Sequence, residues 1–271
     1  MTLHGRSVLM ALCVGSTLVG CGGAGGTSAT KGAVTPKPIF VVHGGFFSCK
    51  LPWSKPIDGT TFTHAKPLLD AAAAWSGSAV PYVVTCFGSG HDTAWIQTDL
   101  NTTSTGVPAG TVPDLVAQRA AQLGEGAEVV MIGHSWGGWL AMSDALKLPE
   151  TARLRYLATL DPISWQTCPP STLISAVLGG TPSGGPEAPC TEAPDDLAPE
   201  FAAIRQRAAY WGEFYQDQFS YLHSSAIDVA DESKHLSYAD LSGADLWEAH
   251  GRVDRDDTVY GGVRDALGGP W

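Results

Sequence analysis

A serine with a glycine two residues away on either side is the first feature of the sequence that could do chemistry. It lies in Gly133-His134-Ser135-Trp136-Gly137, between an apolar β-branched run at 129–132 and a segment of helical character from about 139. This spacing is typical of a tight strand-to-helix turn, which presents the hydroxyl above a sheet and leaves no room for flanking side chains. The motif therefore predicts Ser135 as a nucleophile.

A serine hydroxyl is a weak nucleophile at neutral pH, so Ser135 needs a histidine that acts as general base. Of the histidines that follow it, His250 stands just before the last predicted helix, where the base is expected. His235 lies in a polar loop and remains an alternative. His223 follows an aromatic-rich stretch, which favours a packed or surface position. His250 is the predicted base.

The histidine in turn needs an acid that orients it and stabilises its positive charge, and such an acid belongs at the carboxyl end of a strand. Asp161 follows the run 155–160 and is followed by Pro162, which ends the strand. Asp228 and Asp231 lie later in the chain and remain alternatives, because Asp161 could also serve only to cap a turn. Asp161 is the predicted acid.

Acyl transfer places negative charge on the substrate carbonyl oxygen, and two backbone N–H groups usually stabilise it, by roughly 3 to 4 kcal/mol for each donor. One donor is expected from Trp136, the residue after the nucleophile. The other is expected from the loop His43-Gly44-Gly45-Phe46 after the first strand, at Gly45 or at Phe46. These amides form the predicted oxyanion hole.

Apolar runs and helical segments alternate through the first part of the chain. Runs that are apolar throughout are typical of parallel strands buried on both faces, and helices between such strands are typical of crossover connections. The sequence therefore predicts an α/β fold with a mostly parallel, doubly wound sheet. The predicted strands are 38–42, 81–86, 128–132 and 155–160, and the predicted helices are 65–75, 113–123 and 139–148.

The pattern weakens after Pro162. The segment 167–199 is rich in Gly, Pro and acidic residues, and we interpret it as a lid or cap insertion. Beyond it, the sequence predicts a helix at 201–216, a strand within 219–229 and a closing helix at 258–267 that begins near Asp256 or Asp257.

The first twenty residues have the features of an export signal. Arg6 is the only Lys or Arg there, and the apolar run 8–19 is too short to span a bilayer. The run ends in Leu18-Val19-Gly20-Cys21, which resembles the lipobox of bacterial lipoproteins, where the cysteine becomes the lipidated N-terminus. We therefore predict a signal peptide at 1–20, a flexible Gly- and Ser-rich tether at 21–37 that begins with lipidated Cys21, and a folded domain at 38–271.

Four cysteines remain in the predicted folded domain, and an oxidising compartment outside the cytoplasm would allow them to pair in three ways. We favour Cys49 with Cys86, which lie at neighbouring strand ends, and Cys168 with Cys190, which close one loop. A zinc site is disfavoured because no C-x-x-C spacing occurs.

The composition fits a folded, acidic protein. Hydrophobic residues make up 44% and charged residues 16% of the chain, and its formal net charge is −11. A strongly negative protein is a poor partner for nucleic acid. The lipobox and the export signal together predict a location in the cell envelope, where a lipid anchor would hold the protein at the outer membrane or at another membrane that faces the periplasm.

Two segments together resemble the α/β-hydrolases of the lipase and esterase kind. They are Phe40-Val41-Val42-His43-Gly44-Gly45 and Gly133-His134-Ser135-Trp136-Gly137-Gly138, and the resemblance spans 38–271. Thr159-Leu160-Asp161-Pro162 is similar to the segment that carries the acid in pancreatic-type lipases, which favours Asp161. The segment 250–254 resembles the histidine loop of bacterial relatives.

The resemblance implies an α/β-hydrolase fold and a hydrolase that cleaves carboxylic esters through an acyl-enzyme, without a metal or an organic cofactor. Its substrate would be a small-molecule or lipid ester. Peptidase, thioesterase and polyester depolymerase activities use the same machinery and remain alternatives, because a fold does not select the substrate. A hydrolase scaffold kept only as a binding lipoprotein, with its serine unused, is the alternative from another class.

Overall fold

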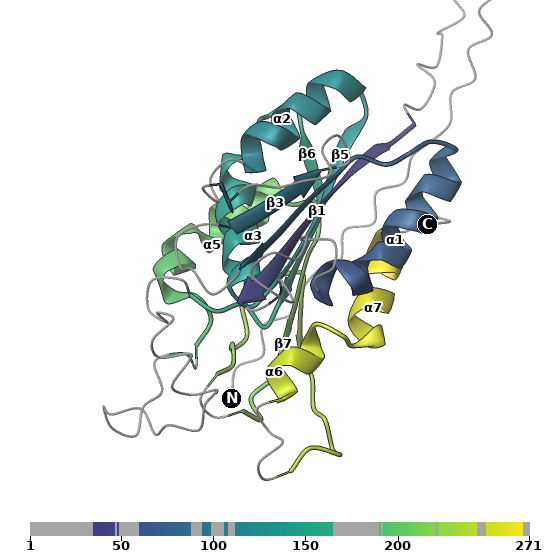
Figure 1. Ribbon diagram of the computed structural model, residues 1–271. Helices are drawn as coiled ribbons and strands as arrows, with labels where there is room; N and C mark the ends of the chain where they lie inside the picture. Colours follow the sequence, from purple (N-terminus) through teal and green to yellow (C-terminus); the bar gives the residue numbers. More distant parts are fainter. Residues whose placement is uncertain are drawn as a thin grey trace, which may run out of the picture. The chain divides into compact units, whose positions relative to one another are not determined.

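The computed structural model describes residues 35–46, 48, 60–87, 94–98, 106–107, 112–164, 190, 192–219, 222–242 and 248–267 (Figure 1). The chain divides into two units, Met1–Ala33 and Val34–Trp271, and all the described residues belong to the second. The predicted leader, Cys21, Cys49, Cys168 and most of the predicted lid therefore lie outside the described residues.

An eight-stranded sheet forms the centre of the described unit, in the order β4-β3-β2-β1-β5-β6-β7-β8. The six strands from β2 to β8 in that order are parallel, whereas β3 and β4 pair antiparallel at one edge. The predicted mostly parallel, doubly wound sheet is confirmed. The strands are β1 Lys37–Phe46, β2 Tyr82–Phe87, β3 Ala94–Thr98, β4 Gly106–Val107, β5 Ala127–His134, β6 Arg153–Leu160, β7 Trp211–Tyr215 and β8 Glu232–His235.

Helices cover both faces of this sheet (Figure 1). On one face lie α1 (Thr60–Ser76) and α7 (Asp257–Leu267), and on the other lie α2 (Val112–Leu123), α3 (Trp136–Lys147) and α5 (Phe201–Arg207). A 3-10 helix, η3, spans Asp195–Glu200, and a short helix, α6, spans Glu248–Val253. The predicted crossover helices are confirmed, although α3 begins at Trp136, directly after the serine.

The two helical layers explain why the central strands carry apolar residues toward both faces of the sheet. In β1, Ile39 and Val41 pack into the cluster under α2, α3 and α5, while Phe40 and Val42 pack into the cluster under α1 and α7. All eight residues of β5 are buried. Since neighbouring side chains of a strand point to opposite faces, a sheet that is covered on both faces needs an unbroken apolar run.

The predicted helix at 201–216 is wrong in its second half. The helix α5 ends at Arg207, and β7 follows it and pairs in parallel with β6. Trp211 and Phe214 are fully buried in β7, and Gly212 packs so closely on Tyr156 that a Cβ there would clash with the tyrosine hydroxyl. The aromatic side chains pack well on a pleated sheet, and Gly212 would destabilise a helix. Together these two effects outweigh the local helical pattern of the sequence.

The strand predicted within 219–229 is also wrong, because the described residues of that segment form turns and irregular chain. The strand forms later, as β8, whose sequence is Glu-Ser-Lys-His. It lies at the edge of the sheet and pairs only with β7, so it needs no apolar pattern. The antiparallel strands β3 and β4 were not predicted at all.

Candidate active site

Ser135 lies on the turn that joins β5 to α3 and takes a strained backbone conformation, with φ 57° and ψ −126°. The turn packs tightly on the end of β1. A Cβ on Gly137 would clash with the backbone carbonyls of His43 and Gly44, so only glycine fits there. A residue with a side chain rarely adopts such backbone angles, and where one does the surrounding packing must hold it. The predicted turn around Ser135 is present in the structure.

Asp161 and His250 form a direct hydrogen bond. The His250 Nδ1 atom lies 2.7 Å from Asp161 Oδ2, although the two residues are 89 positions apart in the chain. Asp161 directly follows β6, has a positive φ of 45° and is completely buried, and His250 belongs to α6 and is 8% exposed. The structure therefore brings the predicted acid and the predicted base together.

Two further donors hold the Asp161 carboxylate. The Ser224 backbone N–H donates to Oδ1 at 2.7 Å, and the Gln216 side-chain amide donates to Oδ2 at 2.9 Å. Hydrogen bonds to a carboxylate favour its charged form and fix its orientation. These two donors therefore hold the buried carboxylate in place against the imidazole.

Backbone and ring contacts tie the serine to this acid and histidine. Ser135 N–H donates to the carbonyl of Leu160, the residue before Asp161, at 2.9 Å. The His134 ring lies 4.7 Å from the His250 ring, centroid to centroid, and its Nε2 donates to the His250 backbone carbonyl at 2.9 Å. Ser135 and the residue before it thus contact the segments that carry Asp161 and His250.

The predicted oxyanion loop also reaches Ser135. A Cβ on Gly45 would lie 2.6 Å from Ser135 Cβ and 3.2 Å from Ser135 Oγ, so only glycine fits there. Its carbonyl accepts hydrogen bonds from Ser48 N–H at 3.1 Å and from Ser48 Oγ at 2.5 Å, which turn the loop back on itself. Phe46 is the last residue of β1, and Trp136 is the first residue of α3.

The alternative histidines and acids are engaged elsewhere. His235 Nε2 binds Asp217 Oδ1 at 2.7 Å on the exposed edge, and His223 Nδ1 binds the Ser224 carbonyl at 2.8 Å. Asp231 accepts hydrogen bonds from Arg205 and from the Trp211 backbone, and Asp228 is exposed. The structure brings none of these groups to Asp161 or Ser135.

Another buried acid–histidine pair includes His43, the first residue of the predicted oxyanion loop. His43 Nδ1 binds Thr85 Oγ1 at 2.8 Å, and His43 Nε2 lies 3.6 Å from Asp144 Oδ2, beyond hydrogen-bonding distance. Both residues are fully buried. Burial lowers the pKa of His43 to about 3 and raises the pKa of Asp144 to about 8, so both side chains are neutral at pH 7.

Sequence reasoning missed the side chains that support the site. Gln216 follows β7, the strand that was taken for helix, so its place at the carboxyl end of the sheet could not be predicted. His134 was placed beside the nucleophile, but its contact with His250 joins residues 116 positions apart. If Trp211–Tyr215 is identified as a strand, Gln216 directly follows it and is expected at the carboxyl end of the sheet.

Of the four cysteines, Cys86 and Cys190 lie within the described residues, and both are buried. Their predicted partners, Cys49 and Cys168, do not, so the predicted pairing stays a prediction. In the described parts of the chain, no three His, Cys, Asp or Glu side chains gather in a way that could hold a metal ion. Nor does any helix within those parts have the length and apolar character needed to cross a membrane.

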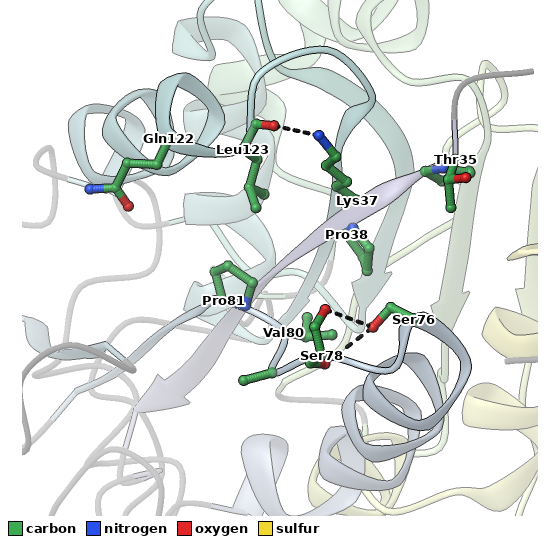
Figure 2. A pocket seen from close by; sticks show the side chains of 11 residues that line it. Thr35, Lys37, Pro38, Ser76, Ser78, Val80, Pro81, Gln122 and Leu123 are labelled. Carbon is green, nitrogen blue, oxygen red and sulfur yellow. Dashed lines mark hydrogen bonds between the residues drawn. The ribbon is translucent and has the colours of Figure 1, made fainter. Parts of the chain in front are cut away.

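A cavity of about 450 Å³ lies at the opposite end of the sheet (Figure 2). Its lining includes Lys37, where β1 begins, and Leu123, where α2 ends, and Lys37 Nζ donates to the Leu123 carbonyl at 2.7 Å. Ligands of α/β sheets bind outside the carboxyl ends of the strands, where Ser135 and Asp161 lie. This cavity is therefore separate from the candidate active site.

Comparison with solved structures gives several matches at low sequence identity. A protein from Agrobacterium vitis S4 assigned as a hydrolase matches with a TM-score of 0.41 and 13% identity, over 86% of this chain and 91% of its own. A soluble variant of monoglyceride lipase from Saccharomyces cerevisiae matches with a TM-score of 0.39 and 13% identity, over 87% of each chain. A lipase-esterase related protein from Clostridium acetobutylicum ATCC 824 matches with a TM-score of 0.38 and 12% identity, over 81% and 93%.

Comparison with curated protein sequences gives no significant match. The family model described as the alpha/beta hydrolase family matches residues 39–266, which include β1, the Ser135 turn, Asp161 and His250. That range covers nearly all of the folded unit. The chain therefore belongs to the alpha/beta hydrolase family.

Proposed function

We propose that the protein is a serine hydrolase that cleaves carboxylic esters, with Ser135 as nucleophile, His250 as general base and Asp161 as the acid that orients the base. The observation that carries this proposal is the 2.7 Å hydrogen bond between Asp161 and His250, beside the strained turn of Ser135. A buried carboxylate on Nδ1 leaves Nε2 as the ring nitrogen that can accept a proton.

The proposed reaction begins when His250 Nε2 takes the proton of Ser135 Oγ, which attacks the ester carbonyl. The Trp136 N–H and an N–H from Gly45 or Phe46 receive the negative charge on the carbonyl oxygen. His250 then gives its proton to the leaving alcohol, and an acyl group remains on Ser135. A water molecule, deprotonated by His250, releases the acid and restores the serine.

A buried apolar cluster lies next to these groups. Trp136 follows the serine, Ala249 precedes the histidine, and both pack in this cluster with Phe219 and Leu222. The cluster holds the segments of the serine and the histidine together as part of the core. The proposed preference for esters, lipid esters among them, rests instead on the proposed lipid anchor, which would hold the site near membrane esters.

A fluorophosphonate probe tests the proposal, because it labels only an activated serine. We expect labelling of the full-length protein and of Ser143→Ala, a matched control in the buried face of α3, and no labelling of Ser135→Ala. Unlabelled wild-type protein should hydrolyse p-nitrophenyl esters faster than peptide amides, and labelling should abolish this hydrolysis because the probe blocks the serine. Absence of labelling in a folded wild-type protein would favour a binding lipoprotein with an unused serine, and preference for thioesters, amides or polyesters would reassign the substrate.

We also propose that the protein is exported and anchored by a lipid on Cys21, on the basis of the Leu18-Val19-Gly20-Cys21 sequence. A lipid anchor on a tether would hold the active site near membrane esters. Mass spectrometry of the N-terminal peptide should find an acylated cysteine, and Cys21→Ser should move the protein out of the membrane fraction. Recovery of Cys21→Ser in the membrane fraction to the wild-type extent would contradict the anchor.

A further inference from the structure

Gln216 is completely buried and uses all its polar atoms. Its Nε2 donates to Asp161 Oδ2 and to the Leu222 carbonyl, both at 2.9 Å, and its Oε1 accepts from Phe219 N–H at 3.0 Å. A backbone N–H can only donate, so the side-chain oxygen must face Phe219. The amino group therefore has to face Asp161, and the orientation of this amide is fixed.

The Gln216 amide and the His250 imidazole donate to the same oxygen. Oδ2 of Asp161 receives both, while Oδ1 receives the Ser224 backbone N–H. Among the described residues, the ion pair of Asp161 is with His250, and no Lys or Arg joins it. A neutral donor fixes the carboxylate without cancelling its charge, which leaves that charge available to an imidazolium.

The other titratable groups that face Asp161 come from three elements. Burial lowers the pKa of His134 at the end of β5, raises the pKa of Glu213 in β7 to about 8, and raises the pKa of Tyr238 after β8. Burial favours the neutral form of each of these groups, so none of them supplies a positive charge that could replace the hydrogen bond from Gln216.

We propose that Gln216 is a positioning residue, whose amide holds the Asp161 carboxylate against the His250 imidazole. This inference rests on the proposed function, because it assigns Gln216 a role in the same reaction. Gln216 acts through Asp161 and does not touch the reacting atoms. Its loss should therefore lower kcat and leave KM unchanged.

Two substitutions test the proposal in the full-length protein. Gln216→Met removes the donor, and kcat for a p-nitrophenyl ester should fall about tenfold at every pH, since a hydrogen bond to a charged group is lost. In Gln216→Glu a protonated carboxyl can still donate to Asp161, but its ionisation places two like charges in contact. The ratio of the Gln216→Glu rate to the wild-type rate should therefore fall at least about fivefold between pH 6 and pH 9.

Gln218 provides the matched control. It lies two residues further along and is half-buried, but its amide binds the backbone of Tyr238, with Nε2 to O at 3.1 Å and N to Oε1 at 2.5 Å. Gln218→Met and Gln218→Glu should keep the wild-type kcat and pH profile. Wild-type kcat in folded Gln216→Met, or a flat rate ratio for folded Gln216→Glu, would overturn the proposal. If Gln216→Glu does not fold, kcat of Gln216→Met decides alone.

The low-field proton NMR signal of the His250 Nδ1–H, hydrogen-bonded to Asp161, gives a readout without catalysis. It should be present in the wild type and in Gln218→Met, and it should shift or broaden in Gln216→Met. An inactive wild type whose signal responds to Gln216→Met would refute the proposed function and retain the positioning role. An active wild type with an unchanged signal and an unchanged kcat in Gln216→Met would refute the positioning role alone.

Discussion

Two buried acid–histidine pairs lie at the carboxyl end of one sheet, and they differ in almost everything except residue type. Asp161 and His250 share a hydrogen bond of 2.7 Å, and backbone and amide donors occupy the rest of the carboxylate. Asp144 and His43 approach only to 3.6 Å, and neither Asp144 oxygen has a hydrogen-bond partner among the described residues. Asp161 and Asp144 are equally buried.

The comparison shows that burial does not determine the state of a carboxylate. A buried charge is costly unless hydrogen bonds replace its water, and only Asp161 has them. Asp144 avoids the cost by holding its proton, and burial accordingly raises its pKa to about 8. One carboxylate has the hydrogen bonds that the proposed reaction requires, and the other is a neutral part of the core next to the proposed oxyanion loop.

The strongest way to break this comparison is to make the same substitution in both acids. Asp161→Asn should lower kcat for an ester by about 10³ to 10⁴, because an amide cannot stabilise the imidazolium or hold the correct tautomer. Asp144→Asn should change kcat less than about threefold, because an amide resembles the neutral acid. Steady-state hydrolysis of a p-nitrophenyl ester measures both, and equal losses in the two variants would show that the pairs act alike.

The oxyanion loop, which begins with His43 of the neutral pair, should be the next most sensitive region. Gly45→Ala should lower kcat about 10²-fold, because its Cβ would lie 2.6 Å from Ser135 Cβ and must push the loop amides away from the carbonyl oxygen. Gly261→Ala in α7 is the control, since its Cβ would contact nothing within 4 Å. We expect that control to keep wild-type kcat and to gain about 0.5 to 1 kcal/mol of stability. Full activity in Gly45→Ala would remove this loop from the mechanism.

The smallest expected effect concerns stability and its dependence on pH. The folded protein holds the Asp144 proton up to about pH 8, whereas the unfolded chain releases it near pH 3.8. The stabilisation of the wild type is therefore complete below about pH 4 and is lost as the pH rises to about 8. Asp144→Asn removes this loss, so its free energy of unfolding should exceed that of the wild type by about 1 to 3 kcal/mol at pH 9.

Urea unfolding at pH 5 and at pH 9 measures this difference. Glu213 has a pKa raised to about 8 by burial and contributes a loss of the same sign, so Glu213→Gln should give a second, separate gain at pH 9. A gain for Asp144→Asn that is as large at pH 5 as at pH 9 would mean that Asp144 is already ionised in the folded protein at pH 5.

The parts of the site that the sequence made predictable are those attached to long apolar strands. Ser135 and Asp161 directly follow β5 and β6, whose mainly apolar second halves mark the carboxyl end of the sheet. His250 was predicted from its place before the last helix, and that helix forms at Asp257–Leu267. Strand ends and helix starts are local features, so the sequence carries them plainly.

Features that depend on contacts between distant segments could not be predicted. The role of Gln216 could not be predicted, because the strand before it, β7, is short, contains a glycine and is stabilised by pairing with β6. The polar edge strand β8 has no apolar pattern to read. Asp144 stands in a helix where an acid is ordinary, and only the packing of α3 against β1 buries it beside His43.

Positive φ angles occur at only two described residues that are not glycine, Ser135 and Asp161. Each such backbone conformation costs a side-chain-bearing residue on the order of 1 to 2 kcal/mol, a cost that glycine would not bear. At Ser135, whose side chain makes no hydrogen bond within the described residues, selection for stability alone would favour glycine. At Asp161, by contrast, glycine would leave the buried donors of Gln216, Ser224 and His250 without their acceptor. Among relatives of this chain, glycine in place of Ser135 would therefore mark a lineage that has given up the proposed chemistry and kept the scaffold.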